Sequence, residues 1–295
     1  MLELCLVNNT FSTEVIVTTY NNPVALELTL TALANQDLPV KNICIADDGS
    51  TIETKESIDK MILNLPQINI RHLWQEDTGF NKNTILNKAI ATSEADYLIF
   101  IDGDCISCPH FVQRHFDLAN PNTFVTGSVI RLDAKTSSLI TAEAILEKNI
   151  FTHSWLSEQG QIDRIGTKLK TNIYGNKVSS ILEYLSPVKK VWNGGNTSAW
   201  RHDLIKVNGF NQNLRYGAED VELGVRLNNI GVFGRHIRYS APLLHLDHPR
   251  GYAEKEQILK NKAYVKQVKK ERVKWADQGI DSKNKTEGLR RVHQD

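Results

Sequence analysis

Short β-rich runs alternate with helix-like segments through the first hundred residues, and this order constrains the fold more than any other feature of the sequence. The β-rich runs are residues 14–19, 42–46, 68–74 and 96–101. The helix-like segments between them are residues 23–34, 51–63 and 82–92. Several of the runs are continuously apolar, which is typical of parallel strands that helices cover on both faces. The order therefore predicts an α/β fold with a doubly wound, mostly parallel central sheet.

Polar clusters follow three of these β-rich runs. In a doubly wound sheet, ligands bind outside the carboxyl ends of the strands, so clusters at that level converge on one edge. The clusters are Thr18, Thr19, Tyr20 and Asn21 after the first run, Asp47 and Asp48 after the second, and Asp102, Gly103 and Asp104 after the fourth. We therefore expect a ligand site at this edge of the sheet.

Asp102 and Asp104 stand two residues apart, so both side chains can lean to the same side, with Gly103 giving clearance. Two carboxylates about 4 Å apart repel by roughly 4 kcal/mol at an effective dielectric near 20, a cost that a bound divalent cation reverses. Carboxylate and diphosphate oxygens suit Mn²⁺ or Mg²⁺. The alternative is a solvated acidic turn, because the pattern is short.

Asp47 and Asp48 offer paired acceptors at the end of the second run. Carboxylates in this position suit the hydroxyls of a ribose and the N–H groups of a base. The same residues, followed by Gly49 and Ser50, also form a good turn and helix-cap sequence. A nucleotide contact and a structural turn therefore both stay open at this point.

The motifs of the first half, taken in order, resemble the nucleotide-binding half of family 2 glycosyltransferases with a GT-A fold. They are residues 18–21 (TTYN), 47–50 (DDGS), 74–80 (WQEDTGF), 87–90 (NKAI) and 102–104 (DGD). Later motifs resemble elements of bacterial chondroitin polymerase-like and β-1,4-galactosyltransferase-like enzymes. They are residues 193–196 (NGGN), 209–211 (GFN) and 217–223 (GAEDVEL). The resemblance covers about residues 14–250.

The resemblance implies a GT-A domain in two halves. The nucleotide-sugar-binding half is expected at residues 1–132, the acceptor-binding and catalytic half at 133–250, and a basic helical tail at 251–295. By the same resemblance, Thr19 and Asp47 contact the nucleobase, and Asp48 or Asp102 contacts the ribose. The remaining implied donor-site residues are Thr18, Tyr20, Asn21, Lys82 (at a phosphate), Gly103, Gly194, Gly195 and Asn196.

The resemblance makes Asp220 the candidate catalytic base, with Glu219 binding acceptor hydroxyls. An inverting transfer needs one base opposite the departing diphosphate, and a carboxylate at the start of a helix can accept the proton of the attacking hydroxyl. Without the family context, both would be ordinary first-turn acids stabilised by the helix dipole. The expected two glycines before these acids are Gly217 and Ala218 here, which puts donor or acceptor preference in question.

The resemblance also implies the metal ligands. Asp104 is one, and His245 aligns with the position from which related enzymes supply a histidine. His248 is a rival, because the family spacing from histidine to the following proline is one residue shorter than it is from His245. We favour His245 as the ligand.

Cys105 and Cys108 form a C-x-x-C directly after the acidic motif. Such a pair can carry redox chemistry or supply half of a zinc site. Since no second closely spaced Cys or Cys-His pair completes four ligands, we expect structural thiols. Trp192 and Trp200 are either sugar-stacking rings or core residues.

The charge balance gives a formal net charge of +1, which excludes a general nucleic-acid binder. The N-terminal residues lack the basic segment of a secretion signal, and no segment approaches the ~18 apolar residues that span a bilayer. We therefore expect a cytoplasmic protein. Beyond Gly251, a lysine-rich stretch predicts either a solvated helix face or a contact with anionic lipid, which would place the chain at the inner face of the plasma membrane.

The expected function is a metal-dependent inverting transfer of a sugar from a nucleotide-sugar, best a UDP-sugar, to the hydroxyl of a glycan or glycolipid acceptor. The resemblance suggests synthesis of bacterial surface polysaccharide or lipopolysaccharide. One alternative is a non-catalytic module that binds nucleotide-sugar or carbohydrate. Another is a sugar-nucleotide pyrophosphorylase, which should show a glycine-rich basic loop after the first run, where this chain has residues 20–23 (YNNP).

Overall fold

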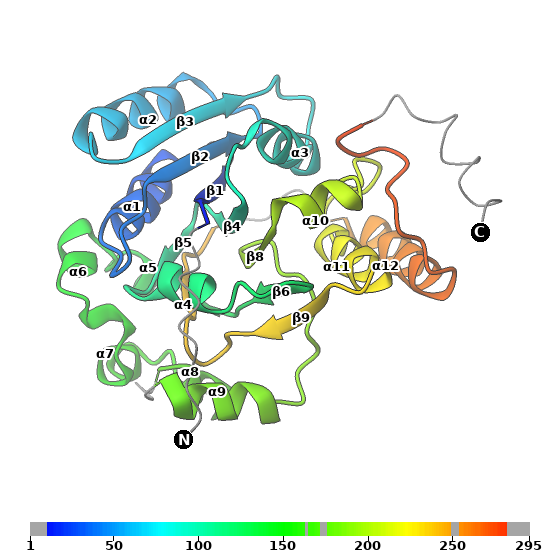
Figure 1. The fold of residues 1–295 in the computed structure, drawn as a ribbon. Helices are drawn as coiled ribbons and strands as arrows, with labels where there is room; N and C mark the ends of the chain where they lie inside the picture. Colours follow the sequence, from blue (N-terminus) through cyan, green and yellow to red (C-terminus); the bar gives the residue numbers. More distant parts are fainter. Residues whose placement is uncertain (1–10, 163–164, 172–175, 249–253, 282–295) are drawn as a thin grey trace.

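The computed structural model describes residues 11–162, 165–171, 176–248 and 254–281. Its centre is a seven-stranded sheet with the order β3-β2-β1-β4-β8-β6-β9 (Figure 1). The strands are β1 (Thr13–Thr19), β2 (Asn42–Asp47), β3 (Asn69–Trp74), β4 (Tyr97–Asp102), β6 (Thr123–Thr126), β8 (Asn196–Trp200) and β9 (Phe233–His236). All neighbours are parallel except β8, which runs antiparallel to β4 and β6. The predicted mostly parallel sheet is confirmed.

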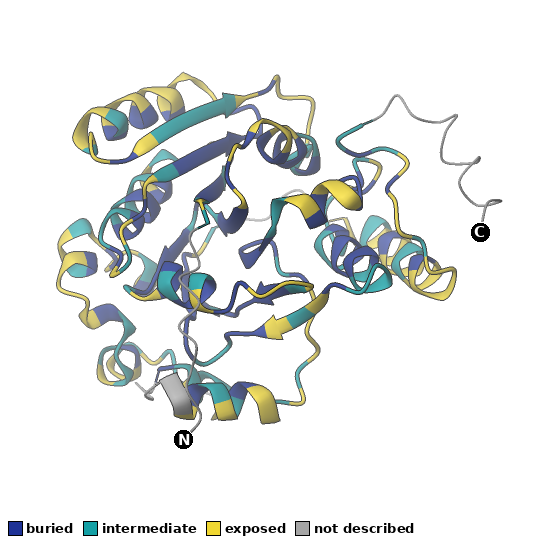
Figure 2. Cartoon of the chain, in the orientation of Figure 1, coloured by how far each residue is buried: buried dark blue, intermediate teal, exposed yellow. Residues whose placement is uncertain are grey.

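Helices cover both faces of this sheet because its central strands are apolar on both sides. One face packs against α1 (Pro23–Ala34), α2 (Ile52–Asn64) and α4 (Phe111–Asp117). The other packs against α3 (Lys82–Thr92), α10 (Arg201–Lys206) and α11 (Glu219–Asn229). The bounds of α1 and α3 are those predicted from the sequence. Figure 2 shows the resulting pattern, with dark central strands and yellow outer faces on the helices.

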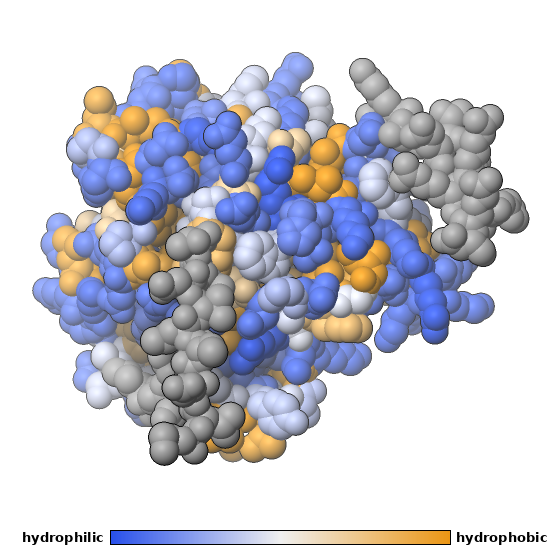
Figure 3. All heavy atoms as spheres, in the orientation of Figure 1, coloured by the Kyte–Doolittle hydropathy of each residue, from blue (hydrophilic) through white to orange (hydrophobic). Residues whose placement is uncertain are grey.

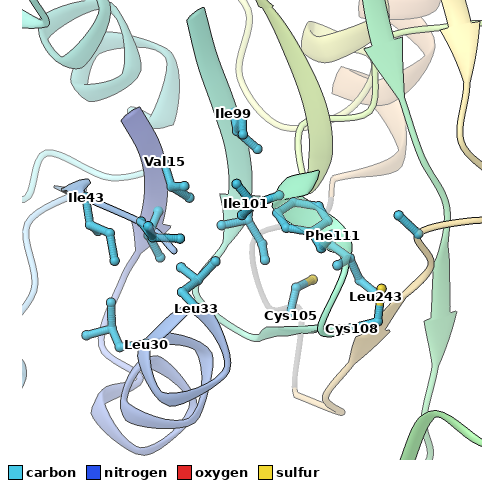
Figure 4. Close-up of a cluster of buried hydrophobic side chains, with 14 of the residues drawn as sticks. Val15, Leu30, Leu33, Ile43, Ile99, Ile101, Cys105, Cys108, Phe111 and Leu243 are labelled. Atoms are coloured by element: carbon cyan, nitrogen blue, oxygen red, sulfur yellow. The ribbon is translucent and has the colours of Figure 1, made fainter. Parts of the chain in front are cut away.

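The alternation along β1 illustrates how one strand serves two cores. Val15 and Val17 point into the first hydrophobic cluster, and Ile16 points into the second. In Figure 4, Val15 and Ile99 lie on the same side of the sheet as Leu30 and Leu33 of α1. This is the two-sided burial that a continuously apolar parallel strand requires.

A second sheet of three strands lies beside the end of β4. It has the order β5-β10-β7, with β5 (Cys105–Ser107), β7 (Val129–Arg131) and β10 (Leu243–His245). In its register His245 faces Cys105 across the antiparallel pair. This small sheet, which the sequence pattern did not predict, brings residues near 245 next to the acidic motif at 102–104.

Short helices fill the stretch after β7. They are α5 (Ala134–Ser137), α6 (Ala142–Leu146), the 3-10 helix η1 (Asn149–Phe151), α7 (His153–Glu158), α8 (Ile165–Thr171) and α9 (Asn176–Leu185). Apolar residues of this stretch, such as Ile145 and Leu156, join Ile106 and Leu244 of the small sheet in a third hydrophobic cluster. The poor periodicity of the sequence here reflects short helices of three to ten residues.

Part of the predicted tail is an integral layer of the fold. Helix α12 (Lys255–Lys270) packs against α11, with Asn261 and Val268 buried. The amide of Asn261 donates to the carbonyls of Arg215 (2.9 Å) and Gly217 (2.8 Å). The basic side chains are exposed, as predicted for a solvated helix face, and Figure 3 shows hydrophilic atoms over α12. Residues 282–295 lie outside the described part. Across the described residues, every helix is either too short or too polar to span a bilayer.

Candidate functional site

Lys82, the first residue of α3, lies at the centre of a cluster of carboxylates. Its Nζ donates to Oδ1 of Asp102 at 2.6 Å. Burial alone would lower the pKa of this amine, but neighbouring carboxylates raise it above its ordinary value. These carboxylates belong to Asp102, Asp220 and Glu219. The charge of Lys82 also acts on Asp104. The structure thus places acids from two separate segments, the end of β4 and the start of α11, around one lysine.

The turn at the end of β4 presents the two aspartates. Oδ1 of Asp102 accepts a hydrogen bond from Oγ1 of Thr18 at 2.8 Å, which holds this carboxylate at the strand end. The N–H of Gly103 donates to the carbonyl of Thr18 at 2.7 Å. A Cβ at position 103 would lie 2.8 Å from that carbonyl oxygen, so the turn requires glycine. Glycine therefore sets the direction in which Asp104 leaves the strand.

Asp104 faces two histidines and the neighbouring aspartate. Its Oδ2 lies 3.0 Å from Nε2 of His248, and its Oδ1 lies 3.8 Å from Nε2 of His245. The ligand atoms of these three residues lie within 4.8 Å of one another, as do those of Asp102, Asp104 and Cys105. Burial favours the neutral acid, but the hydrogen bond from His248 and the charges of both histidines lower the pKa of Asp104. Carboxylate and imidazole are donors that suit a divalent transition metal.

The two histidines differ in what holds their rings. Nδ1 of His245 lies 2.7 Å from the carbonyl oxygen of Leu246, so this nitrogen is a donor and Nε2 is left facing Asp104. A metal-binding histidine commonly donates its second N–H to a carbonyl in this way. The rings of His245 and His248 stack with centroids 5.3 Å apart. Both therefore stay beside Asp104.

Two glycines let half-buried carboxylates approach the backbone. The N–H of Gly194 donates to Oδ2 of Asp220 at 2.9 Å, and a Cβ there would lie 2.6 Å from the same oxygen. A Cβ at Gly195 would lie 2.7 Å from Oδ2 of Asp102. The glycine pair therefore brings the catalytic candidate and the acidic motif together.

Asn196, the residue after this glycine pair, has a structural role. It is fully buried, and its Nδ2 donates to the carbonyls of Ser128 and Ala241 at 3.2 and 3.0 Å. Nε2 of His115 lies 3.1 Å from its Oδ1. Burial lowers the pKa of His115 to about 3, so the ring is neutral and donates to one of its two partners. Asn196 thereby holds β8 against neighbouring loops.

Glu219 and Asp220 begin α11 after an unusual turn. Ala218 has a φ of 71°, in the left-handed region that alanine rarely adopts. Oε2 of Glu219 accepts the N–H of Gly217 at 2.6 Å. Burial, and then the charge of Asp220, raise the pKa of Glu219 to about 7. Burial also raises the pKa of Asp220, and in the described part of the chain its Oδ1 has no hydrogen-bond partner.

The strand-end residues of β1 are mostly engaged with neighbouring loops. Thr19 is buried and its carbonyl accepts the N–H of Asp48 at 3.0 Å. Asn21 accepts the N–H of Thr51 at 2.8 Å through Oδ1. Tyr20 is 49% exposed, and its hydroxyl donates to Asp77 at 2.9 Å. The exposed tyrosine ring leaves an aromatic surface at this edge.

Asp47 and Asp48 stabilise the turn after β2. Asp47 is fully buried, accepts the N–H of Ser50 at 2.8 Å and lies 3.0 Å from Nε2 of His72. Asp48 accepts from the amide of Gln75 (2.6 Å) and the N–H of Asn81 (2.9 Å), while burial raises its pKa. The structure thus gives both aspartates the turn role that the sequence left open beside the nucleotide role.

Beside Glu219 and Asp220 lies a cavity of about 480 Å³ that the sequence analysis did not identify. Its wall includes Trp192, Tyr216, Lys170, Lys189, His236 and Arg238. These residues come from α8, β9 and the loops around them, and no local motif connects them. None of the predicted residues at the ends of β1, β2 and β4 lines the cavity. Asp220 therefore stands between the acidic motif and a separate pocket.

The cysteines and tryptophans of the sequence analysis have structural positions. Cys105 and Cys108 are free and buried, and burial raises the pKa of Cys108 to about 12, so its thiol is inert at neutral pH. Trp192 is buried in the second hydrophobic cluster. Trp200 is partly buried, packs against the first cluster and donates from Nε1 to the carbonyl of Asn120 at 3.0 Å.

Two family models and several curated proteins match this chain. The model for glycosyl transferase family 2 matches residues 14–180, and the model for the N-terminal domain of galactosyltransferase matches residues 177–248. The chain is 24% identical over 234 residues to a chondroitin synthase of Escherichia coli, covering 76% of this chain and 33% of that protein. It is 23% identical to a chondroitin synthase of Pasteurella multocida, covering 91% of this chain and 28% of that protein. The chain thus spans about a third of the length of these relatives or less.

Solved structures share the fold at low sequence identity. A mannosyltransferase from Pyrobaculum calidifontis in complex with GDP-Man and Mn²⁺ superposes with a TM-score of 0.56 at 15% identity, covering 89% of this chain and 72% of that one. GalNAc-T7 with UDP, GalNAc and Mn²⁺ superposes with a TM-score of 0.59 at 12% identity, covering 88% and 48%. The central sheet with its flanking helices is therefore that of GT-A proteins.

Proposed function

Because the chain belongs to glycosyl transferase family 2, we propose that it transfers a sugar from a UDP-sugar to an acceptor hydroxyl and inverts the anomeric centre. Membership confirms the resemblance seen in the sequence. The observation that carries the proposal is the arrangement of Asp102, Asp104 and Asp220 around Lys82. It joins the implied metal-binding motif to the implied base, which are more than a hundred residues apart in the chain.

Asp220 is the base in this proposal. Its Oδ2 is held by the N–H of Gly194, and its Oδ1, which has no hydrogen-bond partner among the described residues, would take the proton of an acceptor hydroxyl. Burial raises its pKa, which strengthens it as a base, while the charge of Lys82 favours the ionised form that a base needs. A single carboxylate in this place fits one displacement, and hence inversion. Glu219, beside it, binds acceptor hydroxyls.

Asp104 and His245 would hold the divalent cation, with Mn²⁺ or Mg²⁺ as candidates. The fit is supported by the clustering of their ligand atoms and by the carbonyl of Leu246 that orients the imidazole. When bound, the cation would neutralise charge on the leaving diphosphate. Lys82 supplies a fixed positive charge next to the same place, as expected for a phosphate contact.

The donor would lie along the ends of β1, β2 and β4. Thr19 and Asp47 are assigned to the base, and Asp48 or Asp102 to the ribose. The carboxylate of Asp47 already contacts Ser50 and His72. In this proposal it therefore binds the base through oxygens that it shares with these two residues. Thr18, Tyr20, Asn21, Gly103, Gly194, Gly195 and Asn196 complete the donor site, with Asn196 acting through the position of β8.

The acceptor in this proposal is a glycan or glycolipid, and the setting is synthesis of bacterial surface polysaccharide or lipopolysaccharide. Relatives named chondroitin synthase support a polysaccharide product. The exposed lysines of α12, together with the exposed Leu259 and Trp275, support peripheral contact with an anionic membrane surface at its inner face.

The test begins with a screen of nucleotide-sugars for thermal stabilisation in the presence of Mn²⁺, since a ligand of the native state raises the apparent stability. The stabilising donor is then used to compare Asp220→Asn with the native protein. Turnover should fall by roughly 10²–10⁴-fold, the contribution of a positioned general base, with donor binding retained. Asp59→Asn, a surface carboxylate on α2, is the matched control and should leave turnover unchanged.

Three results would contradict the proposal. Unchanged turnover in Asp220→Asn would remove the base assignment. Donor binding by the native protein without any turnover across an acceptor panel would favour a non-catalytic binding module. Retention of the anomeric configuration in the product, read by NMR, would contradict the single displacement.

A further inference from the structure

The cavity beside Asp220 has a basic wall. Lys170 and Arg238 line it on one side, and Lys189 adds an exposed third cation. His236 also lines the cavity, but burial lowers its pKa, and its ring nitrogens lie 3.2 Å from the carbonyls of Thr126 and Lys189. The ring is therefore neutral and donates to one of these two carbonyls. We call the surface formed by Lys170, Lys189 and Arg238 the basic wall.

Two cations of the basic wall lie close enough to oppose each other. Burial, and then the charge of Arg238, lower the pKa of Lys170 to about 8. In the described part of the chain, Nζ of Lys170 bonds the carbonyl of Val129 at 2.9 Å, and Nε of Arg238 has no hydrogen-bond partner. Keeping two partly buried like charges together costs free energy unless an anion joins them.

Each acid that lines the same cavity has one carboxylate oxygen engaged by a backbone N–H. Oδ2 of Asp220 accepts from Gly194, and Oε2 of Glu219 accepts from Gly217. Three polar atoms of the cavity residues have no partner among the described residues: Nε1 of Trp192, Nε of Arg238 and Oδ1 of Asp220. Two are donors and one is an acceptor. Such orphaned groups are rare in folded proteins and call for an explanation, for which a ligand is one candidate.

We propose that this cavity binds an acceptor sugar that carries a carboxylate or a phosphate group, with the anionic group on Lys170 and Arg238 and the attacking hydroxyl on Asp220. The inference rests on the proposed function and adds the chemical class of the acceptor. The acceptor, rather than the donor, is assigned because the cavity contains neither the acidic motif nor the strand-end residues of β1 and β2. Asp220 is the point that the two sites share.

The experiment compares three probes that share one ring and differ at C6: methyl glucoside, methyl glucuronide and methyl glucoside 6-phosphate. Binding is measured by ligand-observed NMR with UDP and Mg²⁺ present. At least one charged probe should bind about tenfold more tightly than the neutral one, since hydrogen bonds to charged groups are roughly twice as strong as neutral ones. The charged probe that binds more tightly identifies the anionic group as a carboxylate or a phosphate.

Two variants locate the site. Lys170→Gln and Arg238→Gln should each reduce the preference for the charged probe to about two- or threefold, because each removes one charged donor. Arg238→Lys, which keeps the charge, should retain most of it. Lys168→Gln is the matched control, because Lys168 lies on the same helix, is exposed and does not line the cavity. Circular dichroism confirms that each variant is folded.

Equal binding of neutral and charged probes by the native protein would overturn the inference, and so would a preference that survives both glutamine variants. If Arg238→Gln raises the KM of the nucleotide-sugar and leaves acceptor binding unchanged, the anionic group belongs to the donor and the acceptor assignment fails. Turnover with neutral acceptors alone would contradict the inference but would be consistent with the proposed function. Tighter binding of the charged probes without any turnover would support the anion site and contradict the proposed function.

Discussion

The two sides of Asp220 carry opposite charge. Asp102 and Asp104 lie on one side, where Lys82 forms an ion pair with Asp102 and its charge also acts on Asp104. On the other stand Lys170 and Arg238, whose charges lack a bonded carboxylate in the described part of the chain. The whole chain has a formal charge of only +1, so this separation is invisible in composition. Under the two proposals, the acidic side takes the cation and the diphosphate, and the basic wall takes the anionic group of the acceptor.

The largest effect on sugar transfer is expected when a carboxylate of the acidic side loses its charge. Asp104→Asn should reduce sugar transfer by about 1000-fold or more, because removing the charge of a metal ligand weakens both the cation and its stabilisation of the leaving diphosphate. UDP release at saturating Mn²⁺ measures the effect, and chelation of the metal from the native protein should reproduce it. Asp247→Asn, an exposed carboxylate between the two histidines, is the control. Full activity in the presence of a chelator would contradict the metal site.

Lys82 tests whether the acidic side needs a cation for stability. Lys82→Met leaves Asp102 and Asp220 without their compensating charge and should lower the free energy of unfolding by roughly 3–5 kcal/mol in the absence of metal. Mn²⁺ should restore part of the loss, because the metal supplies positive charge to the same cluster. Urea denaturation with and without Mn²⁺ measures both values.

The control for Lys82 is Lys88→Met, which removes an exposed lysine from the same helix. It should change the free energy of unfolding by less than about 0.5 kcal/mol. An Mn²⁺ effect of equal size in both variants would contradict the placement of the metal beside Lys82.

Glu219 lies at the border between the acidic side and the basic wall, so its protonation tests the difference in charge between them. Its folded pKa of about 7 lies above its ordinary value of 4.5, so the folded protein binds the proton more tightly than the unfolded chain. The stabilisation is present below pH 4.5 and is lost as the pH rises to about 7, amounting to up to about 3 kcal/mol. Glu219→Gln does not titrate and should become more stable relative to the native protein over this range.

Denaturation of both proteins at several pH values between 4 and 8 measures this difference. A difference in unfolding free energy that stays constant with pH would show that folding leaves the pKa of Glu219 unshifted. Glu143→Gln, a fully exposed first-turn acid of α6 whose pKa is lowered rather than raised, is a matched control that should not reproduce the trend.

The smallest expected effect concerns the turn between the two sides. Ala218 has a φ of 71°, and an alanine in the left-handed region costs roughly 1 kcal/mol that glycine avoids. Ala218→Gly should therefore raise the free energy of unfolding by about 1 kcal/mol. Ala263→Gly, in the exposed middle of α12, should lower it by a similar amount. A loss of stability in both variants would contradict the strain at Ala218.

The first half of the fold was predictable because its signals are local. Continuous apolar runs define β1, β2 and β4, and Pro23 at the first turn marks α1, since each pattern needs only neighbouring residues to be recognised. The strand-end positions of Asp47 and Asp102 followed from the rule for doubly wound sheets. The antiparallel β8, the short strands of the second sheet and the one-turn helices were not predicted, because segments of three to seven residues carry too little periodicity.

Short patterns of residue type were enough to predict the α/β class and to identify the acidic motif, Asp220 and His245 as candidates. What surrounds these residues became known from the three-dimensional arrangement. The resemblance implied only a phosphate contact for Lys82, whereas the structure surrounds it with four acids. Lys170 and Arg238 carried no signal, since charge at a site depends on which distant segments meet there. The physical reason is that electrostatic energy follows distance in space and burial, and neither can be read along the chain.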